Sequence, residues 1–331
     1  MKHKFIIKNI GKYNNIKLAQ GLELGQFRML PRKTTDHVGT GISTGTYGDY
    51  WFDMPKGKAL FKTFYGYGRE IRNTRMYNEL LCNELCSQIG MPCAEYESAH
   101  FEEDDGVVSY NIIKKGETLQ SLDEFAYGTP DGEINLEALS VVFDEYIEDG
   151  YKINKKQAII DLYRIAVFDY LTLQTDRNDS NINMVYTPRN KSYKVAPLFD
   201  NEFAFAGQAL LRLKEKKLYT SDKLMSVYKD YCKMLAISYD DYENKHRIYN
   251  QVKLISAYAQ KYPVLKKVVV DMLENINIDK AIASLEQKGH TISKEYKEYV
   301  KNIMTYTTQT LSEAIKENFS QKDISELENI M

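Results

Sequence analysis

The pattern of apolar and polar positions divides the chain into two unlike parts. Residues with β-branched or aromatic side chains and glycines prevail up to about residue 155, and helical periodicity prevails beyond it. The clearest helix spans residues 156–173, where apolar side chains recur at helical spacing at Ile159, Ile160, Tyr163, Ala166, Val167 and Tyr170. Such spacing predicts a helix with one buried face. We therefore predict a small mixed lobe followed by a larger helical lobe.

A β-hairpin is predicted directly after this helix. Residues 182–186 and 192–196 favour strands, and a turn containing Pro and Asn joins them at residues 187–191. In the first half, strand patterns occur at residues 49–52, 59–64 and 107–113. One helical pattern occurs there, at residues 74–89. This order predicts an α+β, bilobal fold, with a small β-rich lobe in residues 1–115 and a larger helical lobe in residues 116–331.

Side chains suited to phosphate chemistry flank the hairpin. The loop at residues 175–181 reads Thr-Asp-Arg-Asn-Asp-Ser-Asn, and Leu-Phe-Asp-Asn follows at residues 198–201. Asp176 is a candidate base for the proton of an attacking hydroxyl. Asn181, five positions later, and Asp200 offer the oxygen ligands that Mg²⁺ prefers. A plain polar turn is the alternative, but the flanking helix and hairpin favour a magnesium and base centre.

A glycine-rich segment at residues 39–48 is the candidate for holding phosphate groups. Its central positions are Gly41, Ser43, Thr44 and Gly45. Glycines let the backbone approach a polyphosphate, and free N–H groups can bind it. The spacing does not match the G-x-G-x-x-G pattern well, so a plain flexible hairpin is the alternative.

Lys62 stands out because it lies inside an otherwise apolar strand. A lysine there is costly unless it reaches the surface or meets an anion. One interpretation is a solvent-facing edge position. The other is a lysine that grips the α- and β-phosphates of a nucleotide, held in place by Glu79 on the following helix. A solvated helix charge is the alternative for Glu79, and Glu84 is the competing partner.

The strand at residues 107–113 leads into the connection between the predicted lobes. We predict that backbone groups of Ile112, Ile113 and Lys114 meet the adenine edge of a bound nucleotide. An edge strand followed by a turn is the alternative, and the sequence does not separate the two interpretations.

Composition and charge narrow the class of protein. The chain has 331 residues, of which 43% are hydrophobic and 27% charged, as in ordinary globular proteins. A net charge of −2 provides no basic field for direct nucleic-acid or membrane binding. The start of the sequence lacks the apolar core of a signal peptide, and the longest apolar helix carries Asp161, Arg164 and Asp169. We expect a cytoplasmic protein without a membrane span.

The cysteines favour buried thiols in a reducing compartment over a metal site. Cys82 and Cys86 are one helical turn apart on a predicted helix, with Cys93 beyond it, and no histidine lies nearby at ligand spacing. Zinc sites usually show two matched pairs of ligands, and free cysteines are among the most buried residue types.

Taken together, these motifs resemble the HipA-like serine/threonine kinases of bacteria, within the wider protein-kinase and phosphoinositide-kinase superfamily. The resemblance rests on five features in order: Lys62, the Asn-Glu pair at 78–79, Gly-Met-Pro at 90–92, the loop at 175–181, and Pro-Leu-Phe-Asp-Asn at 197–201. It covers most of the chain, from about residue 40 to about residue 310. Its catalytic motif is fairly specific and its glycine-rich loop is not.

This resemblance implies a protein-kinase-like fold that uses ATP and Mg²⁺. Asp176 becomes the catalytic base, Asn181 and Asp200 become magnesium ligands, and Lys62 with Glu79 becomes the ion pair. The implied reaction is phosphoryl transfer to a Ser or Thr hydroxyl of a protein. The implied setting is bacterial toxin–antitoxin or stress control, in which a small DNA-binding antitoxin-type partner often restrains the kinase.

In this family the phosphate-covering loop can carry an autophosphorylated serine, which makes Ser43 and Thr44 the autophosphorylation candidates. Two positions depart from the family pattern: Asn178 stands where His is common, and Glu202 stands where a small residue is common. Both departures bear on substrate preference and rate. A phosphoinositide or small-molecule kinase is the alternative enzyme, and a pseudokinase that binds a nucleotide or a partner without transfer is the alternative of another class.

Overall fold

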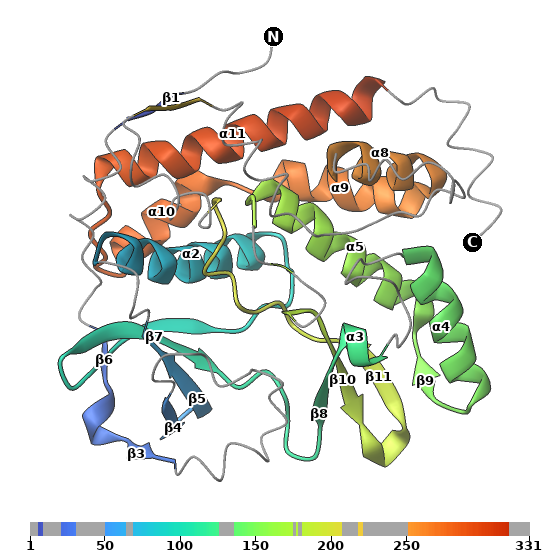
Figure 1. The fold of residues 1–331 in the computed structure, drawn as a ribbon, viewed down its shortest axis with the longest axis horizontal. Helices are drawn as coiled ribbons and strands as arrows, with labels where there is room; N and C mark the ends of the chain where they lie inside the picture. Colours follow the sequence, from blue (N-terminus) through green and yellow to red (C-terminus); the bar gives the residue numbers. More distant parts are fainter. Residues whose placement is uncertain are drawn as a thin grey trace.

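The predicted α+β, bilobal architecture is confirmed by a computed structural model (Figure 1). The structure describes residues 6–8, 21–30, 50–63, 69–125, 136–174, 177, 181–206, 218–220 and 251–317. A curled β-sheet dominates the first part of the chain, and helices dominate the second part. Among the described helices, none is both long enough and apolar enough to cross a membrane.

The first lobe is built on a six-stranded sheet. Its strands, in spatial order, are β2 (Leu22–Glu23), β6 (Tyr96–Phe101), β7 (Asp104–Tyr110), β5 (Gly57–Lys62), β4 (Tyr50–Met54) and β3 (Arg28–Met29). All neighbours are antiparallel except β2 and β6. Phe52, Phe61 and Val108 form a buried cluster on this sheet, as alternation along the strands requires.

A glycine fixes how closely β7 approaches the end of β5. A Cβ atom on Gly106 would lie 2.4 Å from the carbonyl oxygen of Lys62 and 2.5 Å from the ring of Phe61. A side chain at this position would therefore push the two strands apart. Gly106 is thus part of what sets the position of Lys62.

Helix α2 (Arg69–Gln88) packs beside β6. Its buried residues belong to the same hydrophobic core as those of the second lobe. The helices of the second lobe are α4 (Leu136–Glu148), α5 (Lys155–Leu171), α8 (Gln251–Lys261), α9 (Pro263–Asn275), α10 (Ile278–Gln287) and α11 (Lys294–Glu317). Helix α5 is the predicted buried helix, and the side chain of Asn154 caps it by accepting a hydrogen bond from the Gln157 N–H. The main hydrophobic core runs continuously from α2 to α11.

A smaller sheet borders the connection between the lobes. Its strands, in spatial order, are β8 (Thr118–Ser121), β10 (Asn183–Thr187), β11 (Ser192–Val195) and β9 (Lys152–Ile153), with the short helix α3 (Leu122–Phe125) after β8. Strands β10 and β11 form the predicted hairpin, with Met184 opposite Val195. Two other short strands, β1 (Ile6–Lys8) and β12 (Leu218–Thr220), pair with each other and link the start of the chain to the second half.

The buried thiols are as predicted at two of the three positions. Cys82 and Cys86 are buried on α2, and Cys93 is partly buried. Burial raises the pKa values of Cys82 and Cys86 well above their usual range, so both are neutral thiols that pack as small apolar groups.

A buried histidine makes the stability of the second lobe depend on pH. His290 is 7% exposed, and its ring packs against that of Tyr77 on α2 at 5.6 Å between centroids. Burial, and next the positive charge of Lys288, lower its pKa from 6.5 to about 4, whereas Glu84 opposes the shift. The imidazole is therefore neutral in the folded protein at pH 5, where the unfolded chain binds a proton.

We predict that the free energy of unfolding falls as the pH drops from about 6.5 towards 4, by up to about 1.4 kcal/mol per pH unit from this group. Urea unfolding at several pH values measures it, and His290→Gln should flatten the slope in this window. The control is His100→Gln, because the hydrogen bond to Asp105 raises the pKa of His100 and gives the opposite sign. An unchanged slope in His290→Gln would contradict the assignment.

Candidate active site

Lys62 lies at the end of β5 with its ammonium group among carboxylates. Its Nζ is 2.9 Å from Glu79 Oε1 and 2.7 Å from Asp200 Oδ1. The side chain is only 13% exposed, so it is not a solvent-facing edge lysine. Burial alone lowers the pKa of Lys62, but the charges of Asp200 and Glu79 outweigh burial and hold the pKa well above its usual range. Lys62 is therefore a cation at every physiological pH.

Glu79 is fully buried on α2 and links Lys62 to the segment that carries Asp200. Its Oε1 accepts the hydrogen bond from Lys62, and its Oε2 accepts one from the Asn201 N–H at 2.8 Å. Burial raises the pKa of Glu79, and the charge of Lys62 counteracts this. The contact predicted between Lys62 and Glu79 is present, whereas the competing candidate Glu84 pairs with Lys288.

Asp200 is held in an uncommon backbone conformation. Its φ is 60°, in the left-handed region, which Asp tolerates better than most residues. Its N–H donates to the Tyr96 hydroxyl at 3.1 Å, and its carbonyl accepts from Gln174 Nε2 at 3.1 Å. Burial favours a raised pKa, but Lys62 outweighs it and lowers the pKa of Asp200, so this carboxylate is an anion at neutral pH.

A second buried ion pair also positions this segment. The guanidinium of Arg177 contacts the carboxylate of Asp169 on α5, with Nε 3.0 Å from Oδ2, and both side chains are completely buried. A buried pair of this kind is costly unless its remaining donors are satisfied. Arg177 meets that condition through hydrogen bonds to backbone and side-chain oxygens around it.

Those hydrogen bonds bring together the two predicted ligand segments. Arg177 Nη1 donates to the carbonyl oxygen of Phe199 at 2.7 Å and to that of Asn181 at 3.4 Å. Arg177 Nη2 donates to Asn201 Oδ1 at 2.7 Å. One guanidinium therefore links the backbone of Asn181 to the backbone before Asp200 and to the side chain after it. The sequence motif contains Arg177, but its structural role was missed.

Glu202 adds a third carboxyl group to the cluster. Its Oε1 is 3.4 Å from Arg75 Nη1, and its Oε2 is 4.0 Å from Lys62 Nζ. The guanidinium of Arg75 also lies over the ring of Phe203 at 4.0 Å. Burial, and next the negative charge of Asp200, raise the pKa of Glu202 to about 8. At neutral pH Glu202 is therefore largely protonated, and it adds little negative charge to the site.

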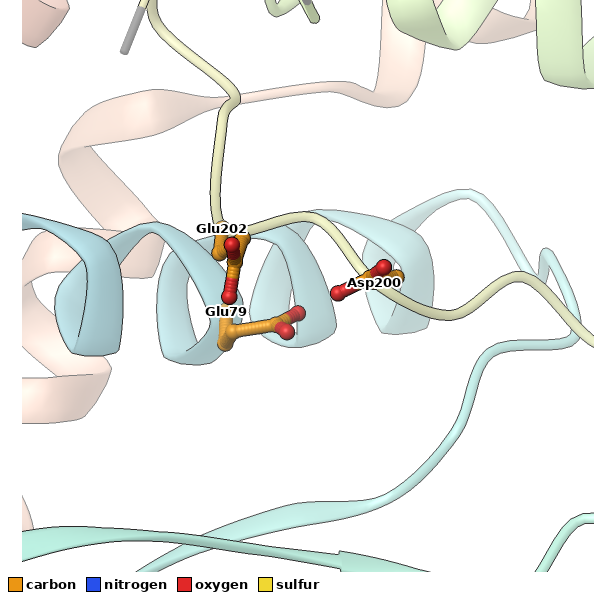
Figure 2. Close-up of side chains that lie close together, drawn as sticks. All are labelled: Glu79, Asp200 and Glu202. Carbon is orange, nitrogen blue, oxygen red and sulfur yellow. The ribbon is translucent and has the colours of Figure 1, made fainter. Parts of the chain in front are cut away.

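The oxygen donors of this cluster are of the type that binds a hard divalent cation, and in this structure the ammonium group of Lys62 lies among them. Figure 2 shows Glu79 projecting from α2 towards Asp200, with Glu202 on the same segment as Asp200. One carboxylate oxygen from each of the three lies within 4.8 Å of the others. Mg²⁺ binds through carboxylate and carbonyl oxygens and water, so Asp200 and Asn181 are suitable ligands.

The predicted adenine-binding segment forms a tight local turn. The N–H of Ile113 donates to Asn111 Oδ1 at 3.3 Å, and the N–H of Lys114 donates to Glu117 Oε2 at 2.8 Å. The Ile113 side chain packs in a small apolar cluster with Val185 on β10. A base edge that binds these N–H groups would have to replace the side chains of Asn111 and Glu117. Adenine binding at Ile112, Ile113 and Lys114 stays a prediction.

The remaining predicted site residues lie outside the described residues. These are Asp176 and the four positions of the glycine-rich loop, Gly41, Ser43, Thr44 and Gly45. The nearest residues in sequence that the structure describes are Gln174 and Arg177. Both side chains are buried, and both donate hydrogen bonds to the segment from Phe199 to Asn201. The roles assigned to the site residues stay predictions, and the contacts around Lys62 support them.

The fold of this protein is the bilobal fold of kinases. The proinflammatory kinase CtkA of Helicobacter pylori is similar with a TM-score of 0.63 and 12% sequence identity, over 91% of this chain and 99% of CtkA. This similarity establishes the kinase fold for nearly the whole chain and confirms the type of fold that the motifs predicted.

Two further kinases are among the similar solved structures. HipA of Shewanella oneidensis, solved with HipB and operator DNA, matches with a TM-score of 0.48 and 14% identity, over 78% of this chain and 60% of HipA. The choline kinase LicA of Streptococcus pneumoniae matches with a TM-score of 0.23 and 15% identity, over 82% of this chain and 92% of LicA. No family model and no curated sequence matches this chain.

We predict that Lys62 and Glu79 act as one unit. Lys62→Ala and Glu79→Ala should each reduce ATP-dependent transfer, and the double variant should be little worse than the worse single variant, because residues in contact are non-additive. Transfer rates of the three variants measure the coupling. Glu84→Ala is the matched control on the same helix and should leave transfer unchanged. Fully additive losses would show that the pair does not act together.

We predict that Asp200→Ala weakens magnesium-dependent ATP binding more than Asn181→Ala does. A carboxylate is the stronger ligand for a hard cation, and water can partly replace an amide. Calorimetric titration with ATP, with and without Mg²⁺, measures both affinities. Asp271→Ala, an exposed carboxylate on α9, is the control for the charge change. Unchanged affinity in Asp200→Ala would disprove the metal-ligand assignment.

Proposed function

We propose that this protein transfers the γ-phosphoryl group of ATP to a Ser or Thr hydroxyl of a protein, with Mg²⁺ as the metal. The observation that carries the proposal is the buried Lys62 held between Glu79 and Asp200 in a kinase fold. A lysine in this position can bind phosphates, and a carboxylate beside it can bind the metal that accompanies them.

Each residue has a specific task in the proposed reaction. Lys62 binds and orients the phosphates, and Glu79 keeps its ammonium group in place. Asn181 and Asp200 would hold Mg²⁺, which neutralises the charge of the β- and γ-phosphates when it is bound. Asp176 accepts the proton of the attacking hydroxyl. Catalysis then depends mainly on positioning and on electrostatic stabilisation.

The substrate and the regulation are proposed from the motif resemblance. A protein hydroxyl is the proposed acceptor, and a small DNA-binding protein of the antitoxin type is the proposed partner. The protein would act in the cytoplasm. Autophosphorylation of Ser43 or Thr44 would add about −1.5 to −2 charge to the glycine-rich loop. This charge would repel the phosphates of ATP, and transfer would fall.

We predict that the purified protein, incubated with labelled ATP and Mg²⁺, incorporates phosphate, and that Asp176→Ala lowers the rate by about 10²- to 10⁴-fold, as the loss of a general base does. Mass spectrometry should locate the phosphate on Ser43 or Thr44. Asp179→Ala removes a carboxylate from the same loop and is the matched control, expected to retain transfer.

The possible results of this experiment test the kinase activity, the catalytic base and the phosphorylated loop separately. Near wild-type transfer by Asp176→Ala would contradict the assignment of the base. A phosphosite elsewhere would contradict the role of the loop and leave the kinase activity standing. Binding of ATP with no transfer under any metal condition would make the protein a nucleotide-binding pseudokinase.

A further inference from the structure

A second candidate binding site lies in the helical lobe, away from Lys62. A cavity of about 560 Å³ opens between α4, the start of α5, the end of α8 and the start of α9. These four helices gather on the right of Figure 1. The volume falls within the range of pockets that bind small molecules, about 300 to 1,000 Å³. The part of α5 that lines it ends at Ile160, about 14 Å along the helix from Asp169 of the candidate active site.

The wall of this cavity is mostly apolar and well supported. Ile159 and Ile160 from α5, Tyr258 from α8 and Leu265 from α9 all contribute to it. The ring of Tyr258 stacks with that of Tyr262 at 6.3 Å between centroids and an interplanar angle of 21°. Tyr258 and Leu265 are each 2% exposed, so packing around them fixes the wall. Such a surface suits a hydrocarbon chain.

Positive charge surrounds the same cavity. Lys155 and Lys156 line it from the first turn of α5, and Lys261 lines it from the last turn of α8. None of the described lining residues is acidic, although Asp144 beside the cavity pairs with Lys155. The excess of cations at an apolar cavity favours an anionic group on the ligand.

Two helix N-termini reinforce this preference. Helices α5 and α9 both begin at the cavity, with Lys155 and Lys156 in one first turn and Val264 and Leu265 in the other. The N-terminus of a helix carries a partial positive charge and attracts anions. The N-cap residue of α9, Tyr262, makes no side-chain capping hydrogen bond, whereas the side chain of Asn154 caps α5. The partial positive charge of both helix ends therefore adds to the charge of the lysines.

We propose that this cavity binds a single-chain amphiphile with a carboxylate head, that is, a fatty acid. The hydrocarbon chain lies against Ile159, Ile160 and Val264, which are partly exposed in the cavity, and the carboxylate is met by Lys156 and Lys261 at the cavity edge. The proposal concerns a binding site of its own and does not depend on phosphoryl transfer.

Equilibrium dialysis with labelled dodecanoate below its micelle concentration tests the site. We expect one saturable site per chain, and dodecanol, which lacks the charge, should bind at least about tenfold more weakly. The double variant Lys156→Glu/Lys261→Glu should lose at least about tenfold in affinity for dodecanoate. The control Lys267→Glu makes the same type of charge change at an exposed position of α9 that does not line the cavity, and it should bind as the wild type does.

A second measurement separates loss of binding from loss of folding. Dodecanoate should raise the melting temperature of the wild type and of Lys267→Glu in a concentration-dependent way, and that of the double variant much less. Absence of saturable binding, or equal binding of dodecanol and dodecanoate with no effect of charge reversal, would overturn the proposal. Tighter binding of dodecyl phosphate than of dodecanoate would overturn the choice of a carboxylate head.

Discussion

The candidate active site depends on the neutralisation of one buried cation. The ammonium group of Lys62 is nearly inaccessible to water, and a buried charge costs several kcal/mol unless an opposite charge lies close to it. Glu79 and Asp200 supply these charges from two different parts of the chain. The contact of these three side chains therefore stabilises the packing of strand β5, helix α2 and the segment after β11. The same contact that stabilises the packing also assembles the groups that the proposed chemistry needs.

A second ion pair transmits this arrangement to the helical lobe. Arg177 contacts Asp169 on α5 and binds Asn201 through its side-chain oxygen, while the N–H of Asn201 donates to Glu79 on α2. Asn201 therefore connects both buried ion pairs. Because each charged group in this chain of contacts is buried, loss of any partner leaves an uncompensated charge next to the others. The two lobes are coupled through these contacts as well as through the apolar core.

Periodicity and residue type were enough to predict much of the fold. Local sequence patterns predict the buried helix α5, the β10–β11 hairpin and the strand that carries Lys62, because each depends on interactions between residues close in sequence. The pairing of Lys62 with Glu79 was predicted because helical spacing puts Glu79 on a face with small residues. The carboxyl of Glu202 and its contact with Arg75 were not predicted, because they depend on how the segment after Asp200 turns back onto α2. The left-handed backbone of Asp200 is likewise set by the distant residues Tyr96 and Gln174.

The contact between Lys62 and Asp200 has a consequence for how ligands enter the site. In the proposed reaction, Mg²⁺ would compete with Lys62 for the carboxylate of Asp200. Lys62 can leave Asp200 at low cost only when another anion receives its charge and another cation takes its place. The proposed nucleotide would meet the first need with its phosphates, and the proposed metal would meet the second, so binding of the two together would be favoured. Glu202 adds little negative charge near neutral pH, because burial and the negative charge of Asp200 raise its pKa to about 8 although Lys62 opposes the shift. With Glu202 neutral, the charges of Lys62 and Arg75 balance those of Glu79 and Asp200. A divalent cation would add positive charge to this balance, and the phosphates of a nucleotide would offset it.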